Sequence, residues 1–207
     1  MSISPQNLKA FIFDWGGVLI ENPAQKLVEF CADFFGVLPK VLAPLILKYI
    51  KLFEIGAIGE QQMWNDICDE LNVPQKQINK SVWGSAIFSV FKAYPEMLVV
   101  LEILKNKGYL LGFLSNTEPP AVSFFMNVLK WSKYFDVCIF SCTEQVAKPH
   151  QEIYLRVCDL LKTPVENVLM IDDKPENIEG AQKAGLQGYL FTTPEQFVID
   201  FKNWNLL

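Results

Sequence analysis

Polar side chains that could do chemistry together stand directly after apolar runs or in a loop between them. The set comprises three carboxylates, a hydroxyl, an amide and an ammonium group: Asp14, Asp172, Asp173, Ser115, Asn116 and Lys148. Three carboxylates in one place repel one another unless a cation joins them. Their oxygen ligands suit Mg²⁺ better than zinc, and a single histidine offers no cluster for a softer metal. These residues therefore predict a magnesium site.

A phosphate monoester would balance the remaining charges of such a site. Mg²⁺ and Lys148 would offset the negative charges of the ester, and Ser115 with backbone N–H groups would bind its oxygens. Asp14 would then attack phosphorus in line and form an aspartyl-phosphate that water later hydrolyses. The glycine pair Gly16 and Gly17 would let backbone and metal approach Asp14 closely.

Five short apolar runs must position these residues. They span residues 9–14, 109–115, 136–140, 167–172 and 187–191, and they are almost continuously apolar, as is typical of strands covered on both faces of a parallel sheet. Helix-length patterns follow at 95–108, 150–162 and 179–186. Alternating strands and helices predict an α/β fold with a Rossmann-like, doubly wound parallel sheet. Ligands bind at the carboxyl ends of such strands, so we expect the polar residues to converge there.

Residues 21–92 interrupt this alternation with helical patterns and no strand. Four helices are expected, at 24–37, 44–56, 60–71 and 75–94, separated by Gly or Pro. The sequence thus predicts a catalytic core made of residues 1–20 and 93–207, with an all-helical cap at 21–92 inserted into the first crossover.

The composition indicates which binding partners and which cellular compartment to expect. The 207 residues are 51% apolar, carry a formal net charge of -5 and include Arg156 as the sole arginine, so no basic face for nucleic acid is expected. The longest apolar stretch, 41–53, is broken by Pro44, Lys48 and Lys51 and falls short of the roughly 20 residues of a membrane span. An odd number of cysteines, 5, without a CxxC pair predicts reduced thiols and, with no visible secretory signal, a cytoplasmic protein. Oligomeric state is left open.

Four segments of the chain resemble a known family. FDWGGVL, FLSNT, KPHQEIY and IDDKPENIEGAQKAGL are similar, in this order, to the signature segments of the haloacid dehalogenase (HAD) superfamily, over roughly residues 5–20 and 93–200. The residues of these segments most resemble those of bacterial sugar-phosphate phosphatases of the glucose-1-phosphate phosphatase type and of the phosphatase domain of soluble epoxide hydrolases. The segment FEIGAIGEQQMW in the insert shares this resemblance. The resemblance implies a phosphatase of a small phosphorylated metabolite, with a sugar phosphate as first choice, and a mobile cap that excludes water.

The resemblance also implies which residues hold the metal. Asp14 would be both nucleophile and Mg²⁺ ligand, and the backbone carbonyl of Gly16 would be a second ligand. Asp173 would bind the ion directly, whereas Asp172 would lie nearby or act through a water molecule.

Four further residues take roles by the same resemblance. Ser115 and Asn116 would hold the phosphoryl group, and Lys148 would stabilise its charge and orient Asp14. Asn177 would support the site through hydrogen bonds.

The chain departs from most phosphatases of this superfamily at Gly16, where they carry an Asp that protonates the leaving group. A positioned general acid contributes about 10²- to 10⁴-fold in rate. Three explanations stay open: the substrate has a good leaving group, such as an anomeric hydroxyl or an acyl group; a cap residue or water supplies the proton; or turnover is weak or lost. His150 is a less favoured donor, because its place beside Pro149 fits a first-turn helix residue.

Two alternatives to the phosphatase follow from this gap. One is a catalytically silent regulatory domain that keeps the metal and phosphate site. The other, less favoured, is a metal-free haloacid dehalogenase, which also lacks the second acid but uses a cap arginine and has non-acidic groups in place of Asp172 and Asp173. The sole arginine here, Arg156, lies outside the insert.

Overall fold

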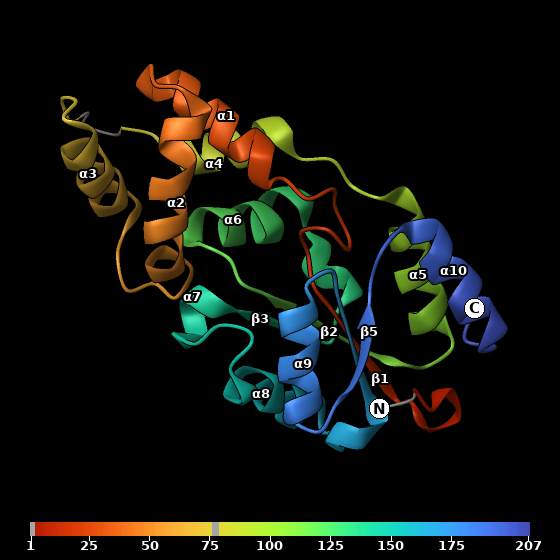
Figure 1. The fold of residues 1–207 in the computed structure, drawn as a ribbon. Helices are drawn as coiled ribbons and strands as arrows, with labels where there is room; N and C mark the ends of the chain where they lie inside the picture. Colours follow the sequence, from red (N-terminus) through yellow and green to blue (C-terminus); the bar gives the residue numbers. More distant parts are fainter. Residues whose placement is uncertain (1–2, 76–78) are drawn as a thin grey trace.

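A five-stranded parallel sheet lies at the centre of the computed structural model, which describes residues 3–75 and 79–207 (Figure 1). The strands are β1 (Ala10–Phe13), β2 (Leu110–Ser115), β3 (Val137–Phe140), β4 (Val168–Asp172) and β5 (Gln187–Leu190). Their order is β3-β2-β1-β4-β5, and each neighbouring pair is parallel. The predicted α/β, Rossmann-like fold is therefore confirmed, and each predicted strand lies within a residue of its expected place.

Helices cover both faces of the sheet, which explains why the strands are apolar throughout. Alternate residues of β1 point to opposite sides. Phe11 and Phe13 belong to the larger buried cluster, which includes residues of α5 (Pro95–Asn106) and α10 (Pro194–Asn203). Ala10 and Ile12 belong to the second cluster, with residues of α8 (Gln151–Leu161) and α9 (Pro175–Lys183).

Four of the five helices between β1 and β2 lie within the insert, as its patterns predict, and the fifth, α5, follows it. The four are α1 (Ala24–Phe35), α2 (Pro39–Glu54), α3 (Glu60–Leu71) and α4 (Val82–Val90). The chain leaves and re-enters the core along adjacent paths, because Glu21 N–H donates to Lys92 O (2.9 Å) and Tyr94 N–H donates to Leu19 O (3.0 Å). These contacts lie at the expected boundary of the insert. Its behaviour as a separate, mobile cap stays a prediction.

Helix starts differ from expectation where proline takes the first turn. The helix expected at 44–56 begins at Pro39, and the one expected at 179–186 begins at Pro175. Proline suits these positions because its fixed φ fits the first turn, where an N–H would have no helical partner. The helix expected at 75–94 begins at Val82, after Ser81 accepts a hydrogen bond from the Gly84 N–H (2.7 Å); positions 76–78 lie outside the described residues.

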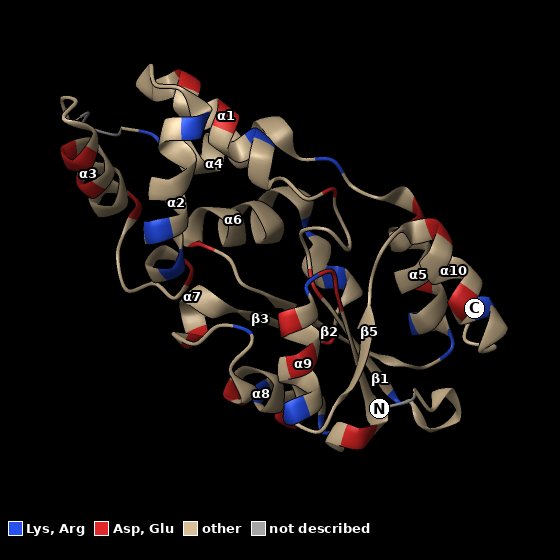
Figure 2. Ribbon diagram, in the orientation of Figure 1, with Lys and Arg blue, Asp and Glu red and all other residues tan. Residues whose placement is uncertain are grey.

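Short elements complete the fold. They are η1 (Pro5–Asn7), α6 (Pro119–Ser123), η2 (Phe124–Leu129), η3 (Trp131–Tyr134), α7 (Ser141–Glu144) and η4 (Val165–Asn167). All five cysteines are free thiols, as expected. Basic and acidic positions are interspersed over the ribbon (Figure 2).

Within the described residues, no single helix is both long and apolar enough to cross a membrane. Taken together, α1 and α2 do satisfy the length and composition, but they are bent by 111° where they join.

Candidate active site

The sheet register brings the predicted residues to one edge. Phe13 of β1 pairs with Phe113 of β2 and Ile171 of β4. The next residue, Asp14, donates its N–H to the Ile171 carbonyl (3.0 Å), so it stands at the end of the central strand. Ser115 ends β2, and Asp172 ends β4. All three side chains are buried.

Lys148 forms the ionic centre of this edge. Its ammonium lies 2.8 Å from Asp14 Oδ1 and 2.6 Å from Asp172 Oδ2, and it also donates to the Leu114 carbonyl (3.0 Å). The lysine side chain is 1% exposed, so these bonds are shielded from water. A buried ammonium with three acceptors is held in one place, which fixes the orientation of Asp14.

The Asp172 carboxylate is fully used in holding this arrangement. One oxygen, Oδ1, accepts from the Lys174 backbone N–H (2.9 Å) and from the Asn177 amide (3.0 Å). The other, Oδ2, accepts from Lys148 and from the same Asn177 amide (3.1 Å). Asn177 thus acts on the site through Asp172.

Asp173 differs from Asp172 because its buried Oδ1 has no hydrogen-bond partner among the described residues. One carboxylate oxygen from each of Asp14, Asp172 and Asp173 lies within 4.8 Å of the others. An orphaned, buried carboxylate oxygen is costly unless a cation or water satisfies it. These residues fit a hard divalent cation such as Mg²⁺, with Asp14 and Asp173 supplying the free oxygens.

The Asp173 carboxylate occupies the space that a side chain at position 17 would take. A Cβ at Gly17 would lie 2.3 Å from Asp173 Oδ2, and the backbone there has a φ of +89°. Glycine alone adopts this conformation without strain. Gly16 has no positive φ, and a Cβ there would meet Pro23 Cδ at an ordinary 3.4 Å.

Burial and neighbouring charges shift the pKa values of Asp14, Asp173 and Lys148. Burial raises the pKa of Asp14 to about 7 despite the nearby Lys148 ammonium, and the Asp172 charge adds to this rise. Burial and Asp172 likewise raise the pKa of Asp173. Burial opposes the charge of Lys148, but Asp14 and Asp172 outweigh it and raise the pKa of that ammonium. The lysine is thus charged, and a further positive charge near Asp14 and Asp173 would favour their ionised forms.

The Asn116 side chain hydrogen-bonds to the backbone of the loop that contains Lys148. Its amide donates to the Lys148 carbonyl (2.9 Å) and accepts from the Lys148 backbone N–H (2.8 Å). This pair of bonds ties the loop after β2 to the loop after β3. Asn116 therefore positions Lys148, an arrangement that the motif alone does not indicate.

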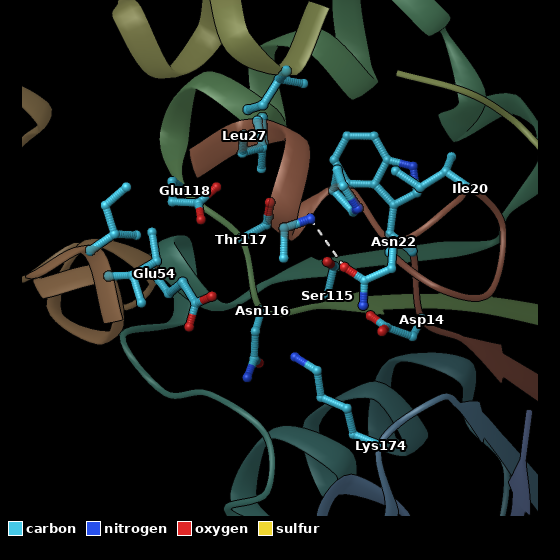
Figure 3. Close-up of a pocket in the computed structure, with 18 of the residues that line it drawn as sticks. Asp14, Ile20, Asn22, Leu27, Glu54, Ser115, Asn116, Thr117, Glu118 and Lys174 are labelled. Atoms are coloured by element: carbon cyan, nitrogen blue, oxygen red, sulfur yellow. Dashed lines mark hydrogen bonds between the residues drawn. The ribbon is translucent and has the colours of Figure 1, made fainter. Parts of the chain in front are cut away.

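A cavity of about 610 Å³ opens above this edge and reaches the insert helices. Six of the predicted residues line it: Asp14, Gly16, Ser115, Asn116, Lys148 and Asn177. Asp172 lies beneath, hydrogen-bonded to Lys148 and Asn177, and Asp173 belongs to the carboxylate cluster. Lys174 also lines the cavity (Figure 3).

Two glutamates line the same cavity on the side away from Asp14 (Figure 3). Glu54 ends α2, and its backbone carbonyl accepts from Ser141 Oγ of the core (2.5 Å). Glu118 follows β2 and is 7% exposed. Burial, and next the charge of Glu54, raises the pKa of Glu118 to about 7. The indole Nε1 of Trp83 approaches Glu118 without hydrogen-bond geometry.

Burial also raises the pKa of Glu54, against the opposing charges of Lys174 and Lys148. The pair was not predicted from the sequence. Glu118 could have been found from its place two residues after Asn116, in the same strand-end loop. Glu54 gives no such local signal, because it comes from the insert. His150, the other donor considered, is exposed and lies outside the cavity lining.

Comparisons with known proteins are consistent with this architecture. A phosphoglycolate phosphatase of Aquifex aeolicus is 32% identical over 94 residues, 45% of this chain and 44% of that protein. The match thus spans less than half of that relative. A sesquiterpene phosphatase of Aspergillus oryzae is 24% identical over 89% of this chain and 90% of its own.

Solved structures share the fold. A HAD-family enzyme of Bacteroides thetaiotaomicron, in complex with magnesium and inorganic phosphate, has a TM-score of 0.70 and 21% identity, over 89% of this chain and 94% of its own. The model of the haloacid dehalogenase-like hydrolase family matches residues 8–185. The match covers most of the sequence and includes every residue of the site built above, so this chain belongs to the haloacid dehalogenase-like hydrolases.

Proposed function

We propose that the chain is a Mg²⁺-dependent phosphatase that hydrolyses a small phosphate monoester through an aspartyl-phosphate on Asp14. The observation that carries this proposal is the buried cluster in which Lys148 bridges Asp14 and Asp172, while Oδ1 of Asp173 has no hydrogen-bond partner in the described part of the chain. The activities named for the Aquifex and Aspergillus relatives support it. The narrower sugar-phosphate branch stays a prediction.

Asp14, Asp173 and the Gly16 carbonyl would hold the magnesium ion, with Asp172 beside them. Bound there, Mg²⁺ supplies charge neutralisation that lets an anionic carboxylate approach an anionic ester. Asp14 points into the cavity from the end of β1, where Lys148 fixes its carboxylate. Ser115 at the end of β2 is placed to bind a phosphoryl oxygen, and Lys148 to offset the phosphoryl charge.

The residues then account for both halves of the reaction. An oxygen of Asp14 forms a bond to phosphorus as the bond between phosphorus and the leaving-group oxygen breaks. Water next attacks the phosphorus of the aspartyl-phosphate, and the bond to Asp14 breaks with release of inorganic phosphate.

The leaving group needs a proton that Gly16 cannot give, and we assign this role to Glu54, with Glu118 behind it. Both line the cavity that contains Asp14, and burial raises the pKa of each carboxyl group, so that each holds a proton to a higher pH than an exposed glutamate does. The carboxyl proton of Glu54 passes to the leaving-group oxygen as the ester bond breaks. A proton from the attacking water then returns to Glu54.

A comparison of esters with poor and good leaving groups distinguishes an acid role of Glu54 from a structural one. Glu54→Gln should lower kcat/KM about 10²-fold or more for an alkyl phosphate, whose alkoxide must be protonated, and far less for p-nitrophenyl phosphate. Gly16→Asp places an acid at the usual family position and should partly restore the alkyl rate of Glu54→Gln. Equal losses for both esters, with no rescue, would contradict the assignment.

The phosphatase itself is tested with a panel of phosphate monoesters, assayed with Mg²⁺ and with EDTA, alongside Asp14→Asn. We expect turnover that EDTA and Asp14→Asn both abolish. Activity that survives both changes would overturn the mechanism. Tight calorimetric binding of Mg²⁺ and phosphate without turnover of any ester, even in Gly16→Asp, would instead favour the silent regulatory domain.

A haloacid dehalogenase is less well supported. Arg156, the residue that could act as the required arginine, lies on α8, where its Nε is 3.6 Å from Glu144 Oε2. It is outside the cavity lining.

A further inference from the structure

Beyond its phosphoryl end, the cavity is walled by hydrocarbon side chains. Helix α2 presents Ala43, Ile46, Leu47 and Ile50 to it, followed by Lys51 and Glu54 at the end of the helix. The spacing i, i+3, i+4, i+7 places the four apolar residues on one face of the helix. Leu47 is 70% exposed although it is large and apolar, so this wall continues to the mouth of the cavity.

Two other helices add to the same wall. Helix α4 and the residue after it contribute Trp83, Ile87 and Phe91 at intervals of four residues, and α1 contributes Leu27 and Val28. Figure 3 shows Ile20 above Asp14, and Leu27 above Thr117 and Glu118. Segments that are distant in the sequence thus present the same kind of surface to a ligand.

Two polar side chains of the wall are hydrogen-bonded within the protein. Asn22 Oδ1 accepts from the Ala24 N–H (3.1 Å), and the Gln25 amide donates to Glu29 Oε1 (2.9 Å). Glu54 and Glu118 lie together in one part of the cavity, and Lys51, Lys174 and Glu176 also line it, so the charged partners of a ligand are few beside the apolar residues of α1, α2 and α4.

A polyol such as a hexose phosphate would meet this wall with several hydroxyl groups. Each hydroxyl that leaves water without a new partner costs free energy, because its hydrogen bonds to water are lost. A hydrocarbon gains on entering the same space, since burying one methylene group strengthens binding roughly fourfold. The cavity volume of about 610 Å³ lies within the usual range for small-molecule sites.

We propose that this site takes the phosphate monoester of a largely apolar alcohol, whose hydrocarbon part fills the space between α1, α2 and α4. The inference rests on the phosphatase function proposed above and names its substrate class. This substrate class differs from the sugar phosphate that the sequence motifs favour. The phosphoryl group would lie at Asp14 and Lys148, and the ester oxygen would face Glu54.

The test compares two primary alkyl esters, n-octyl phosphate and sorbitol 6-phosphate, with p-nitrophenyl phosphate as a general check of turnover. All three are assayed with Mg²⁺ at submicellar concentrations. We expect kcat/KM for the octyl ester to exceed that for the sorbitol ester by at least about tenfold, since a single unmatched hydroxyl already discriminates by up to about 10²-fold.

A pair of variants on α2 locates the effect. Leu47→Asp should lower the ratio of octyl to sorbitol kcat/KM at least about fivefold, because it puts a charge on the apolar wall. Leu52→Asp is the matched control: Leu52 is 42% exposed on the same helix and outside the cavity lining, so the ratio should stay as in the unmodified protein.

The outcomes separate the two levels of the proposal. An octyl-to-sorbitol ratio below ten, or a ratio that Leu47→Asp and Leu52→Asp change alike, would overturn the apolar substrate class and leave the phosphatase standing. Failure to turn over any of the three esters, including p-nitrophenyl phosphate, would overturn the phosphatase and this inference with it.

Discussion

Replacing Glu118 by glutamine should stabilise the protein at high pH and not at low pH. The carboxyl group is 7% exposed, and burial followed by the charge of Glu54 raises its pKa from 4.5 to about 7. The unfolded chain therefore releases this proton at a lower pH than the folded chain does. Ionisation of Glu118 thus favours unfolding increasingly as the pH rises from about 4.5 to about 7, and the penalty is complete above that window.

The size of the effect follows from the pKa difference. At about 1.4 kcal/mol per pH unit, the penalty reaches roughly 3 kcal/mol at pH 8. Glutamine has nearly the same shape and cannot ionise. Glu118→Gln should therefore gain up to this amount relative to the unmodified protein at pH 8, or about 6–12 °C in Tm for a chain of this length, and the gain should vanish near pH 4.5.

Urea unfolding between pH 4.5 and 8.5, at constant Mg²⁺, measures this difference. Titrating groups that do not interact with Glu118 are present in both proteins and cancel in the comparison, whereas the repulsion between Glu54 and Glu118 is part of the difference measured. Glu102→Gln on α5 is the matched control, because Glu102 is exposed, and it should show no such pH-dependent gain. A constant difference between Glu118→Gln and the unmodified protein across this range would refute the buried, proton-holding role of Glu118.

Three further changes test the geometry of the site. Gly17→Ala should abolish Mg²⁺ binding measured by calorimetry, since its Cβ would lie 2.3 Å from Asp173 Oδ2, whereas Gly59→Ala, with nothing within 4 Å of the added Cβ, should bind normally. Lys148→Met leaves two buried carboxylates without their ammonium and should destabilise the metal-free protein by about 3–5 kcal/mol in urea unfolding; a change below 1 kcal/mol would show that the ion pairs are unimportant. Asn116→Ala removes two hydrogen bonds to the Lys148 backbone and should cost about 1–3 kcal/mol while lowering kcat; unchanged kcat would contradict its role in positioning Lys148.

The sheet and the convergence of the site could be predicted because their signals are local. The strands are apolar runs, and polar residues that end or follow some of them, such as Asp172 and Asp14, mark the carboxyl ends. Parallel order then brings these ends to one edge, whatever the intervening chain does. The helix starts are harder to predict from sequence, because Pro39 and Pro175 fit a first turn and also fit a loop.

The rest of the site depends on contacts between distant segments, which a single sequence does not reveal. The amide of Asn116 pairs with the backbone of the Lys148 loop, although the motif indicates a phosphoryl ligand. Glu54 meets Glu118 because Ser141 ties the end of α2 to the core. The apolar wall of the cavity is likewise built from several helices, and the sequence does not show that they meet. The sugar phosphate favoured by the motifs was therefore predicted without regard to this wall.

The central claim is that Asp14 accepts the phosphoryl group. Its most direct test is acid-quenched mass spectrometry of the protein mixed rapidly with a hydrolysed phosphate monoester and Mg²⁺, followed by mapping of the peptide that contains Asp14. We predict one phosphoryl group on Asp14, absent in Asp14→Asn and in EDTA. Rapid turnover with no phosphoryl group on Asp14 at any quench time, or with the label on another residue, would contradict the mechanism.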